Sequence, residues 1–162
     1  MSQANYYIIR SDDFCLNDSK KFKGLFNETK DYIRNHGLKM CGEEVDRVYL
    51  LECLKRCKYI IVITHNNSQY FNDIVGFSLI ETENKELKCS IFSGKTNSIK
   101  DELLIVILTY MEKTSFYRTL KIMCSCSNDV IYYFLEIGFN ILERYNRNGG
   151  KNICEMCFRI NY

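Results

Sequence analysis

The sequence predicts an α+β domain built on one mixed, mainly antiparallel sheet of about seven strands, flanked by about four helices. Two observations predict this class. Short runs rich in β-branched and aromatic residues alternate with longer stretches whose apolar residues recur at helical spacing. Three of the short runs also follow one another with only polar, turn-like connections. Because 162 residues suit one hydrophobic core, we expect a single domain over 1–162.

The first third of the chain predicts one strand followed by two helices. Residues 5–11 carry an aromatic and β-branched run that ends at a pair of aspartates, as a strand would. Apolar side chains recur at helical spacing over 22–33, and Gly37 can close that helix. A second helix is expected over 43–57, where the apolar stripe is less regular.

The middle of the chain predicts an antiparallel meander followed by a helix. Strands are expected over 59–64, 74–81 and 87–93. The apolar run 103–108 would suit a buried strand or a buried helix by periodicity alone. Its flanks favour a helix of about 15 residues, because Ser98 with Asp101 resembles a capping box.

The last third of the chain predicts a strand, a helix and a terminal hairpin. The strand is expected over 120–126, and the helix over 128–137 ends at Gly138. Two strands, over 141–145 and 153–160, flank a turn at 148–150 that contains two glycines.

Composition and charge exclude several classes of function. The net charge of +2 is too small for the broad basic surface that binding to nucleic-acid backbones requires. No apolar run is long enough to span a bilayer, and the first ten residues lack the layout of a signal peptide. We therefore expect a cytoplasmic protein. The absence of proline and the heavy use of Asn, Ile, Lys and Tyr are typical of low-GC genomes, such as those of large DNA viruses or parasites.

Nine cysteines raise the question of a metal site. Cys124 with Cys126, and Cys154 with Cys157, have spacings that zinc ligands use. On strands, however, Cys154 and Cys157 would point to opposite faces, so four sulfurs would not converge. We therefore expect free, mostly buried thiols and no bound metal, with zinc as the alternative.

The order of elements, together with two local motifs, resembles the GNAT family of acyl-CoA-dependent N-acetyltransferases over nearly the whole chain. In that family a strand leads into a pyrophosphate-binding turn of the form Arg or Gln, two residues, Gly, one residue, Gly or Ala, and then at once into a long helix. Aligning the family's paired leucines with Leu103–Leu104 puts Lys95 at the Arg position, and Ser98 and Lys100 at the two Gly positions. Both glycines of the motif are therefore replaced in this chain.

The resemblance implies that acetyl-CoA is the cofactor and that its pyrophosphate lies at the helix start, where free N–H groups and the helix dipole favour an anion. A lysine at position 100 would either obstruct the close approach that glycine allows or add a charged contact. The positions implied to contact the cofactor are Ile91, Phe92, Ser93, Lys95, Thr96, Asn97, Ser98, Ile99, Lys100, Asn128 and Phe134.

The second motif, Ser127–Asn128 followed by a helix and Gly138–Phe139, puts Phe134 where the family often carries a tyrosine that protonates the departing thiolate. Tyr133, one residue earlier, is the candidate substitute, and a core or surface tyrosine is the alternative.

Acetylation of an amine also needs a base, and the carboxylates at the meander's second turn are the candidates. Glu81 and Glu86 are the residues chosen, and a solvated, charged turn is the alternative.

The implied function is acetyl-CoA-dependent transfer of an acetyl group to a primary amine, on a protein or a small molecule, by direct attack in a ternary complex. The alternative is a GNAT-like binding or structural module that has lost catalysis, for instance in a viral assembly, because the cofactor loop and the tyrosine are both altered. The sequence leaves a monomer, a homodimer and a larger assembly open.

Overall fold

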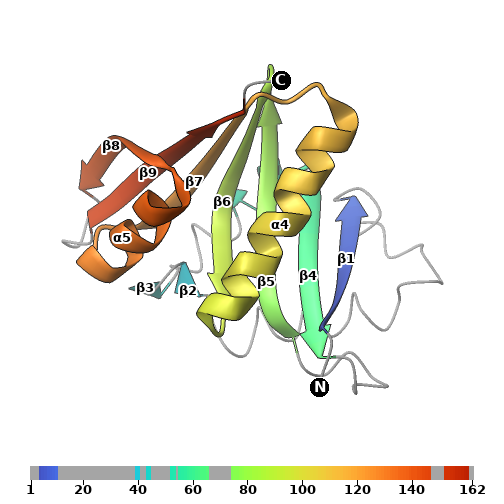
Figure 1. Cartoon of the computed structure of the whole chain (residues 1–162), viewed down its shortest axis with the longest axis horizontal. Helices are drawn as coiled ribbons and strands as arrows, with labels where there is room; N and C mark the ends of the chain where they lie inside the picture. The colour runs from blue at the N-terminus through green and yellow to red at the C-terminus, as the bar shows by residue number, and fades with distance from the viewer. Residues whose placement is uncertain are drawn as a thin grey trace.

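The protein is described here by a computed structural model, which covers residues 4–10, 39–40, 43–44, 52–53, 55–65, 74–146 and 152–160. Figure 1 shows one large sheet with two helices on its near face. In chain order the elements are β1 (Ala4–Arg10), β2 (Lys39–Met40), β3 (Glu43–Glu44), β4 (Tyr59–His65), β5 (Ile74–Glu83), β6 (Glu86–Gly94), α4 (Asn97–Thr114), β7 (Thr119–Ser125), α5 (Asn128–Ile137), β8 (Asn140–Asn146) and β9 (Asn152–Arg159).

The large sheet has seven strands in the order β1-β4-β5-β6-β7-β9-β8. All neighbours in it are antiparallel except β6 and β7, which run parallel. A parallel pair needs a crossover connection, and α4 supplies it. The predicted mixed, mainly antiparallel sheet is therefore confirmed. A separate ribbon pairs β2 with β3.

The central strands are buried on both faces, which explains their nearly continuous apolar sequences. Every residue from Ile60 to Ile63 in β4 is at most 2% exposed, and Phe77 and Leu79 of β5 are equally enclosed. Strands β5 and β6 are joined by Asn84 and Lys85 alone, so their antiparallel pairing is a prediction that needed only local information.

Helix α4 lies across the near faces of β4, β5 and β6 (Figure 1). Its buried stripe includes Leu103, Leu104, Ile107 and Met111, so the apolar run 103–108 is helical, as its flanks predicted. The helix ends at Ser115, which has a left-handed conformation with φ of 52° and donates its N–H to the carbonyl of Met111.

Helix α5 packs beside β7 and β8 and ends where the sequence placed its end. Gly138 has φ of 115°, a conformation that favours glycine, and its N–H donates to the carbonyl of Leu135. The chain turns back at Gly138 and places Phe139 under α5. The centroid of its ring lies 5.2 Å from the ring centroids of both Phe134 and Phe158.

Two local predictions were wrong. Glu43 and Glu44 form β3 instead of the start of a helix, because they pair with Met40 and Lys39; residues 52–53 and 55–56 of the predicted span are helical. The helix N-cap is Thr96, whose Oγ1 accepts from the N–H of Ile99, so Ser98 lies inside the helix. The predicted helix over 22–33 and the turn at 148–150 fall outside the described residues.

Among the described residues, none of the helices combines the length and the apolar character that crossing a bilayer would require.

The Phe134–Phe139–Phe158 contacts predict a large effect of truncation. Phe139 is 1% exposed, so Phe139→Ala would remove buried surface and leave a cavity. We expect it to lower the free energy of unfolding by about 3–5 kcal/mol in denaturant titrations. Tyr132→Ala, at a side chain 61% exposed on α5, should change it by only about 0.5 kcal/mol. Equal losses in the two variants would contradict this packing.

Gly76 predicts a second effect, because α4 approaches β5 closely there. A Cβ atom on Gly76 would lie 2.8 Å from Cγ2 of Ile99 and 3.3 Å from Cβ of Ile63. Gly76→Ala should therefore destabilise the fold by about 1–3 kcal/mol. In the background of Ile99→Ala, which removes Cγ2, the same change should cost less. A double-mutant cycle on unfolding free energies measures this coupling, and strict additivity would argue against the contact.

Candidate functional site

The two parallel strands β6 and β7 pair over only four residues and then separate. Pairing runs from Glu86 opposite Thr119 to Cys89 opposite Ile122, although both strands continue beyond these residues. In Figure 1 the strands diverge toward the start of α4 and toward α5. This divergence is the structural feature on which the candidate site is built.

A β-bulge at Ser90 accompanies the separation. Ile80 of β5 lies opposite Cys89 and Leu79 lies opposite Ile91, so Ser90 is the extra residue on β6. A bulge bends its strand and increases the local twist, which turns β6 away from β7. The buried Ser90 hydroxyl lies 3.4 Å from the carbonyl of Leu79, to which it donates.

A second buried serine stabilises the bulge from the neighbouring strand. The hydroxyl of Ser78 donates to the carbonyl of Ile91 at 2.9 Å. A buried backbone carbonyl needs a hydrogen-bond donor, and this hydroxyl supplies one to Ile91 beside the register shift.

Aromatic rings join the diverging strand β6 to α5 on the helix face. Phe92 of β6 and Phe134 of α5 are both fully buried, and their ring centroids lie 5.8 Å apart in an edge-on arrangement. Phe134, which stands where the resemblance implies a tyrosine, is therefore a core residue that joins α5 to β6. Ile91, the residue before Phe92, is also fully buried.

The connection from β6 to α4 is very short. Gly94 ends the strand, and only Lys95 and Thr96 precede the helix. The N–H of Lys95 donates to the carbonyl of Val75, which ties this link to β5. Lys95 and Thr96 are exposed, whereas Ser93 is half-buried.

The first turn of α4 leaves backbone donors available. Of its first four N–H groups, that of Ile99 donates to Thr96 Oγ1 at 3.2 Å and that of Lys100 donates to the Thr96 carbonyl at 3.0 Å. Within the described part of the chain, the N–H groups of Asn97 and Ser98 have no partner, and both residues are exposed. The first turn also carries no acidic side chain, so the positive end of the helix dipole is uncompensated there.

The side chain of Lys100 turns toward α5 and does not extend past the N-terminus of α4. Its stem passes so close to Gly94 that a Cβ atom there would lie 2.9 Å from Lys100 Cγ. Its ammonium group lies 5.6 Å from the ring centroid of Tyr133. The hydroxyl of Tyr133 in turn donates to Oδ1 of Asp101 at 2.6 Å. Lys100, Asp101 and Tyr133 thus link the start of α4 to α5, and we call this group the α4–α5 link.

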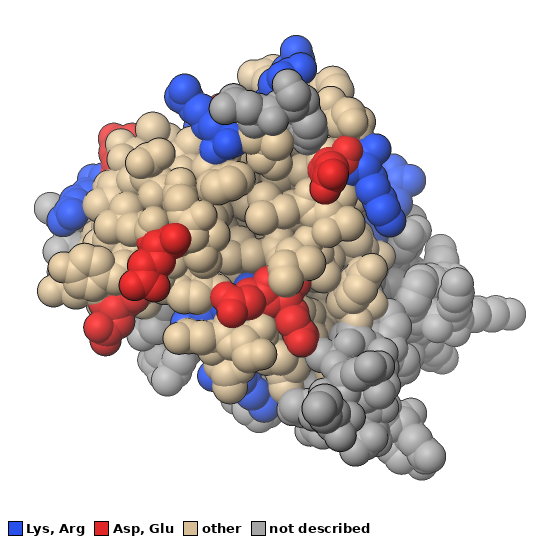
Figure 2. Space-filling view, in the orientation of Figure 1, with Lys and Arg blue, Asp and Glu red and all other residues tan. Residues whose placement is uncertain are grey.

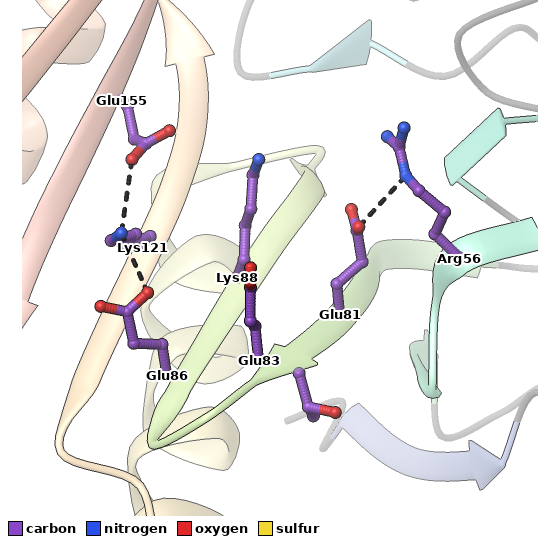
Figure 3. Close-up of a pocket in the computed structure, with 8 residues that line it drawn as sticks. Arg56, Glu81, Glu83, Glu86, Lys88, Lys121 and Glu155 are labelled. Atoms are coloured by element: carbon purple, nitrogen blue, oxygen red, sulfur yellow. Dashed lines mark ion pairs between the residues drawn. The ribbon is translucent and has the colours of Figure 1, made fainter.

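The predicted bases lie apart from this link. Glu81 forms an ion pair with Arg56 at 3.1 Å, and Glu86 forms one with Lys121 at 2.9 Å. Neighbouring residues of β5 and β6 pack under α4, so these two glutamates project from the opposite face of the sheet. They lie beside the paired segment of β6 and β7. The structure therefore brings Glu81 and Glu86 into one cavity but does not place them beside Tyr133 (Figure 3).

The start of α5 is the remaining predicted contact region. Asn128 is its first residue and is exposed, and the N-cap Ser127 makes no side-chain capping bond. Its backbone N–H instead donates to the hydroxyl of Ser125. The side chain of Asn128 is therefore accessible from solvent near the end of β7.

The cysteines adopt the arrangement that strand geometry predicts. Cys124 and Cys154 lie opposite each other on β7 and β9, with Cys126 packed nearby, whereas Cys157 lies opposite Lys121 on the other face. All cysteines in the described ranges are free thiols. Across those same ranges, no group of three or more His, Cys, Asp or Glu side chains is placed to hold a metal ion.

Charged groups of both signs are interspersed on the face that carries α4 and α5, as Figure 2 shows, and the described surface there has no single basic field.

Sequence reasoning did not identify several residues that shape the strand divergence or that pair with Glu81 and Glu86. Ser78 and Ser90 support the divergence of the strands, and no local sequence signal pointed to either. Thr96 was among the residues implied to contact the cofactor, but the start of the helix cap was assigned to Ser98. Arg56 and Lys121, the partners of the two glutamates, are brought in by sheet register and by a separate helical segment, which no local pattern reveals.

Comparison with known proteins gives different results for sequence and for structure. No family model matches the sequence, and no curated protein matches it. Solved structures match over nearly the full length. The ribosomal-protein-S18-alanine N-acetyltransferase from Escherichia coli has a TM-score of 0.63 at 14% identity, covering 99% of this chain and 96% of that chain.

Two further solved structures are similar to the same extent. NAA60 from Arabidopsis thaliana, determined in complex with acetyl-CoA, has a TM-score of 0.63 at 7% identity and covers 98% of this chain and 100% of that chain. A GNAT-family acetyltransferase from Streptococcus pneumoniae has a TM-score of 0.60 at 13% identity, again covering 98% and 100%. The predicted resemblance is confirmed at the level of architecture: this chain has the fold of the GNAT acetyltransferases.

Proposed function

We propose that this protein is an acetyl-CoA-dependent N-acetyltransferase that acts on a primary amine of a protein or a small molecule. The observation that carries the proposal is the separation of β6 from β7 after Cys89 and Ile122, with the start of α4 at the open end. Two solved structures of this fold support it by their chemistry, since one acts on an alanine of a ribosomal protein and another holds acetyl-CoA.

The start of α4 has donors that suit a diphosphate. The N–H groups of Asn97 and Ser98 are exposed and lack partners in the described part of the chain, and the helix dipole favours an anion there. Lys95 adds an exposed positive charge two residues earlier. Backbone donors of this kind do not depend on glycine, so the replaced motif still offers a binding turn.

The chemistry of Cys89, the cysteine at which the pairing of β6 with β7 ends, agrees with direct attack by the amine. Cys89 lies at the point of separation, and burial raises the pKa of its thiol to about 12, although a hydrogen bond with Ser78 lowers it in part. A thiol in that state is neutral at physiological pH and is a poor nucleophile. No acetyl-enzyme through Cys89 is therefore proposed.

Bound acetyl-CoA would supply the acetyl thioester. In the proposed reaction the amine nitrogen forms a bond to the acetyl carbon as the carbon–sulfur bond breaks. Glu86 or Glu81 takes the first proton, which the ammonium group must lose before it attacks. The Tyr133 hydroxyl gives a proton to the departing thiolate, and the second proton, which the nitrogen loses as the amide forms, restores the tyrosine through solvent. Tyr133 would have to exchange its bond to Asp101 for this task.

A second candidate function is a GNAT-fold binding or structural module without catalysis. Three features favour it specifically. Phe134 is buried where the family often has a tyrosine, the hydroxyl of Tyr133 is engaged by Asp101, and the two glutamates hold ion pairs on the other face of the sheet. Binding and turnover experiments separate the two candidates.

Position 97 offers a selective test of cofactor binding. Asn97 is the first residue of α4, where proline is well accommodated, and Thr96 before it is already extended. Asn97→Pro would remove one free N–H. We expect acetyl-CoA to raise the midpoint of thermal unfolding of the wild type, and Asn97→Pro to weaken binding about tenfold or more, as loss of a charge-assisted hydrogen bond would.

Asn97→Ala is the matched control, because it retains the N–H and should bind acetyl-CoA like the wild type. A wild-type protein that shows no thermal shift with millimolar acetyl-CoA would refute the proposed cofactor. Binding without release of CoA in the presence of amine acceptors would favour the module without catalysis.

The role of Tyr133 predicts a kinetic difference between two neighbouring tyrosines. If its hydroxyl protonates the thiolate, Tyr133→Phe should lower kcat on the order of a hundredfold, measured as CoA release, with little change in acetyl-CoA binding. Tyr132→Phe, on the exposed side of α5, should leave kcat unchanged. Retention of full activity in Tyr133→Phe would remove this residue from the mechanism.

A further inference from the structure

A polar cavity of about 350 Å³ opens on the face of the sheet opposite α4. Its volume is at the lower end of the range for small-molecule sites, about 300–1,000 Å³. None of the residues that line it is apolar, so its ligand would be small and polar. The lining residues are Arg56, Glu81, Thr82, Glu83, Glu86, Lys88, Lys121 and Glu155 (Figure 3).

One side of the cavity is electrostatically satisfied. The ammonium group of Lys121 lies 2.9 Å from Glu86 Oε2 and 3.8 Å from Glu155 Oε1. Glu155 Oε2 also lies 3.4 Å from the hydroxyl of Tyr145, which donates to Glu143 at 2.8 Å. The hydrogen bond to Glu86 raises the pKa of Lys121, against the opposing effect of burial. Lys121, Glu86 and Glu155 thus form one charged side of the cavity, and their mutual contacts leave few polar atoms free to bind a ligand.

Glu81, on the other side of the cavity, has a hydrogen-bond acceptor that the described residues do not use. Its Oε1 accepts from Nε of Arg56, but its Oε2 is buried and has no hydrogen-bond partner in the described part of the chain. An unpaired buried carboxylate oxygen is unfavourable, and a bound donor would relieve it. The terminal torsion of a glutamate is soft, so this carboxylate can rotate to present Oε2 to a donor in the cavity, and Oε1 then moves relative to Arg56.

Lys88 offers a positively charged hydrogen-bond donor that complements the acceptor of Glu81. It lies directly opposite Glu81 on β5 and directly opposite Lys121 on β7, yet no partner for its ammonium group is found among the described residues. Two lysines opposite each other on adjacent strands repel, which a bound anion would offset. In Figure 3 Lys88 extends between the Lys121 group and the Arg56–Glu81 pair.

We propose that this cavity binds a small zwitterion of the α-amino acid type, with its ammonium group at Glu81 and its carboxylate at Lys88. The unpaired acceptor and the unpaired donor belong to neighbouring strands, so one short ligand can reach both. A ligand with only one of the two charges would satisfy only one of the groups. The proposed acetyl transfer assigns a base role to Glu86 or Glu81 in this same cavity, but the binding inference is argued only from the contacts of the cavity itself.

Calorimetric titration of the whole chain, without acetyl-CoA, tests the ligand class. L-glutamine, L-serine and L-glutamate serve as zwitterionic probes. For L-glutamine the matched controls are glutaramic acid, which lacks the α-ammonium group, and 4-aminobutanamide, which lacks the α-carboxylate. We expect saturable binding of at least one amino acid, and binding about tenfold or more weaker for both controls. Failure of all three amino acids to bind, or equal binding of either control, would overturn the proposal.

Variants test the two assigned residues. Lys88→Met and Glu81→Gln should each weaken amino-acid binding about tenfold to a hundredfold. Lys85→Met, an exposed lysine in the adjacent turn outside the cavity lining, should bind like the wild type. Thermal unfolding confirms that each variant folds, and Lys88→Gln replaces Lys88→Met if the latter does not. Unchanged affinity in a folded Lys88 variant and in Glu81→Gln would overturn the assignment. Since acetyl-CoA is absent, these results are independent of those for acetyl transfer.

Discussion

The extra residue at Ser90 is the constraint on which the rest of the structure depends. By shifting the register between Leu79 and Ile80 of β5, it turns β6 away from β7 just where their pairing ends. The hydroxyls of Ser78 and Ser90 donate to backbone carbonyls at this irregularity, so the separation is compatible with the burial of residues 89–92 of β6. A regular ladder in its place would keep β6 and β7 paired and remove the opening in front of α4.

The two faces of the sheet around β6 and β7 differ in their chemistry. On the helix face, the start of α4 offers backbone N–H groups, while Lys100, Asp101 and Tyr133 join that helix to α5. On the other face, where β6 and β7 still pair, charged side chains surround a cavity. The proposed acetyl transfer would use groups from both faces, whereas the proposed module without catalysis would use only one of them.

The prediction of the fold succeeded where information is local. Strands β4, β5 and β6 are apolar runs with polar turns between them, and Gly138 marks the end of α5 by a conformation that glycine favours. The N-cap was misplaced because Thr96 and Ser98 are both good capping residues, and only the backbone path chooses between them. Glu43 and Glu44 have good helical propensity, but pairing with Lys39 and Met40 overrides it.

The candidate site was less predictable because its contacts span the chain. Tyr133 and Asp101 are 32 residues apart, and Arg56 meets Glu81 through tertiary packing. Glu81 and Glu86 were identified from the sequence as charged residues at a turn, but the ion pairs that engage them depend on strand register.

The central claim is that the first N–H groups of α4 hold the diphosphate of a CoA cofactor. Amide ¹⁵N–¹H NMR during titration with CoA tests it most directly. The account predicts that the resonances of Asn97 and Ser98 show the largest, saturable changes, with smaller changes at Lys95 and Tyr133. Saturable changes confined to other parts of the chain, or no change at millimolar CoA, would contradict it.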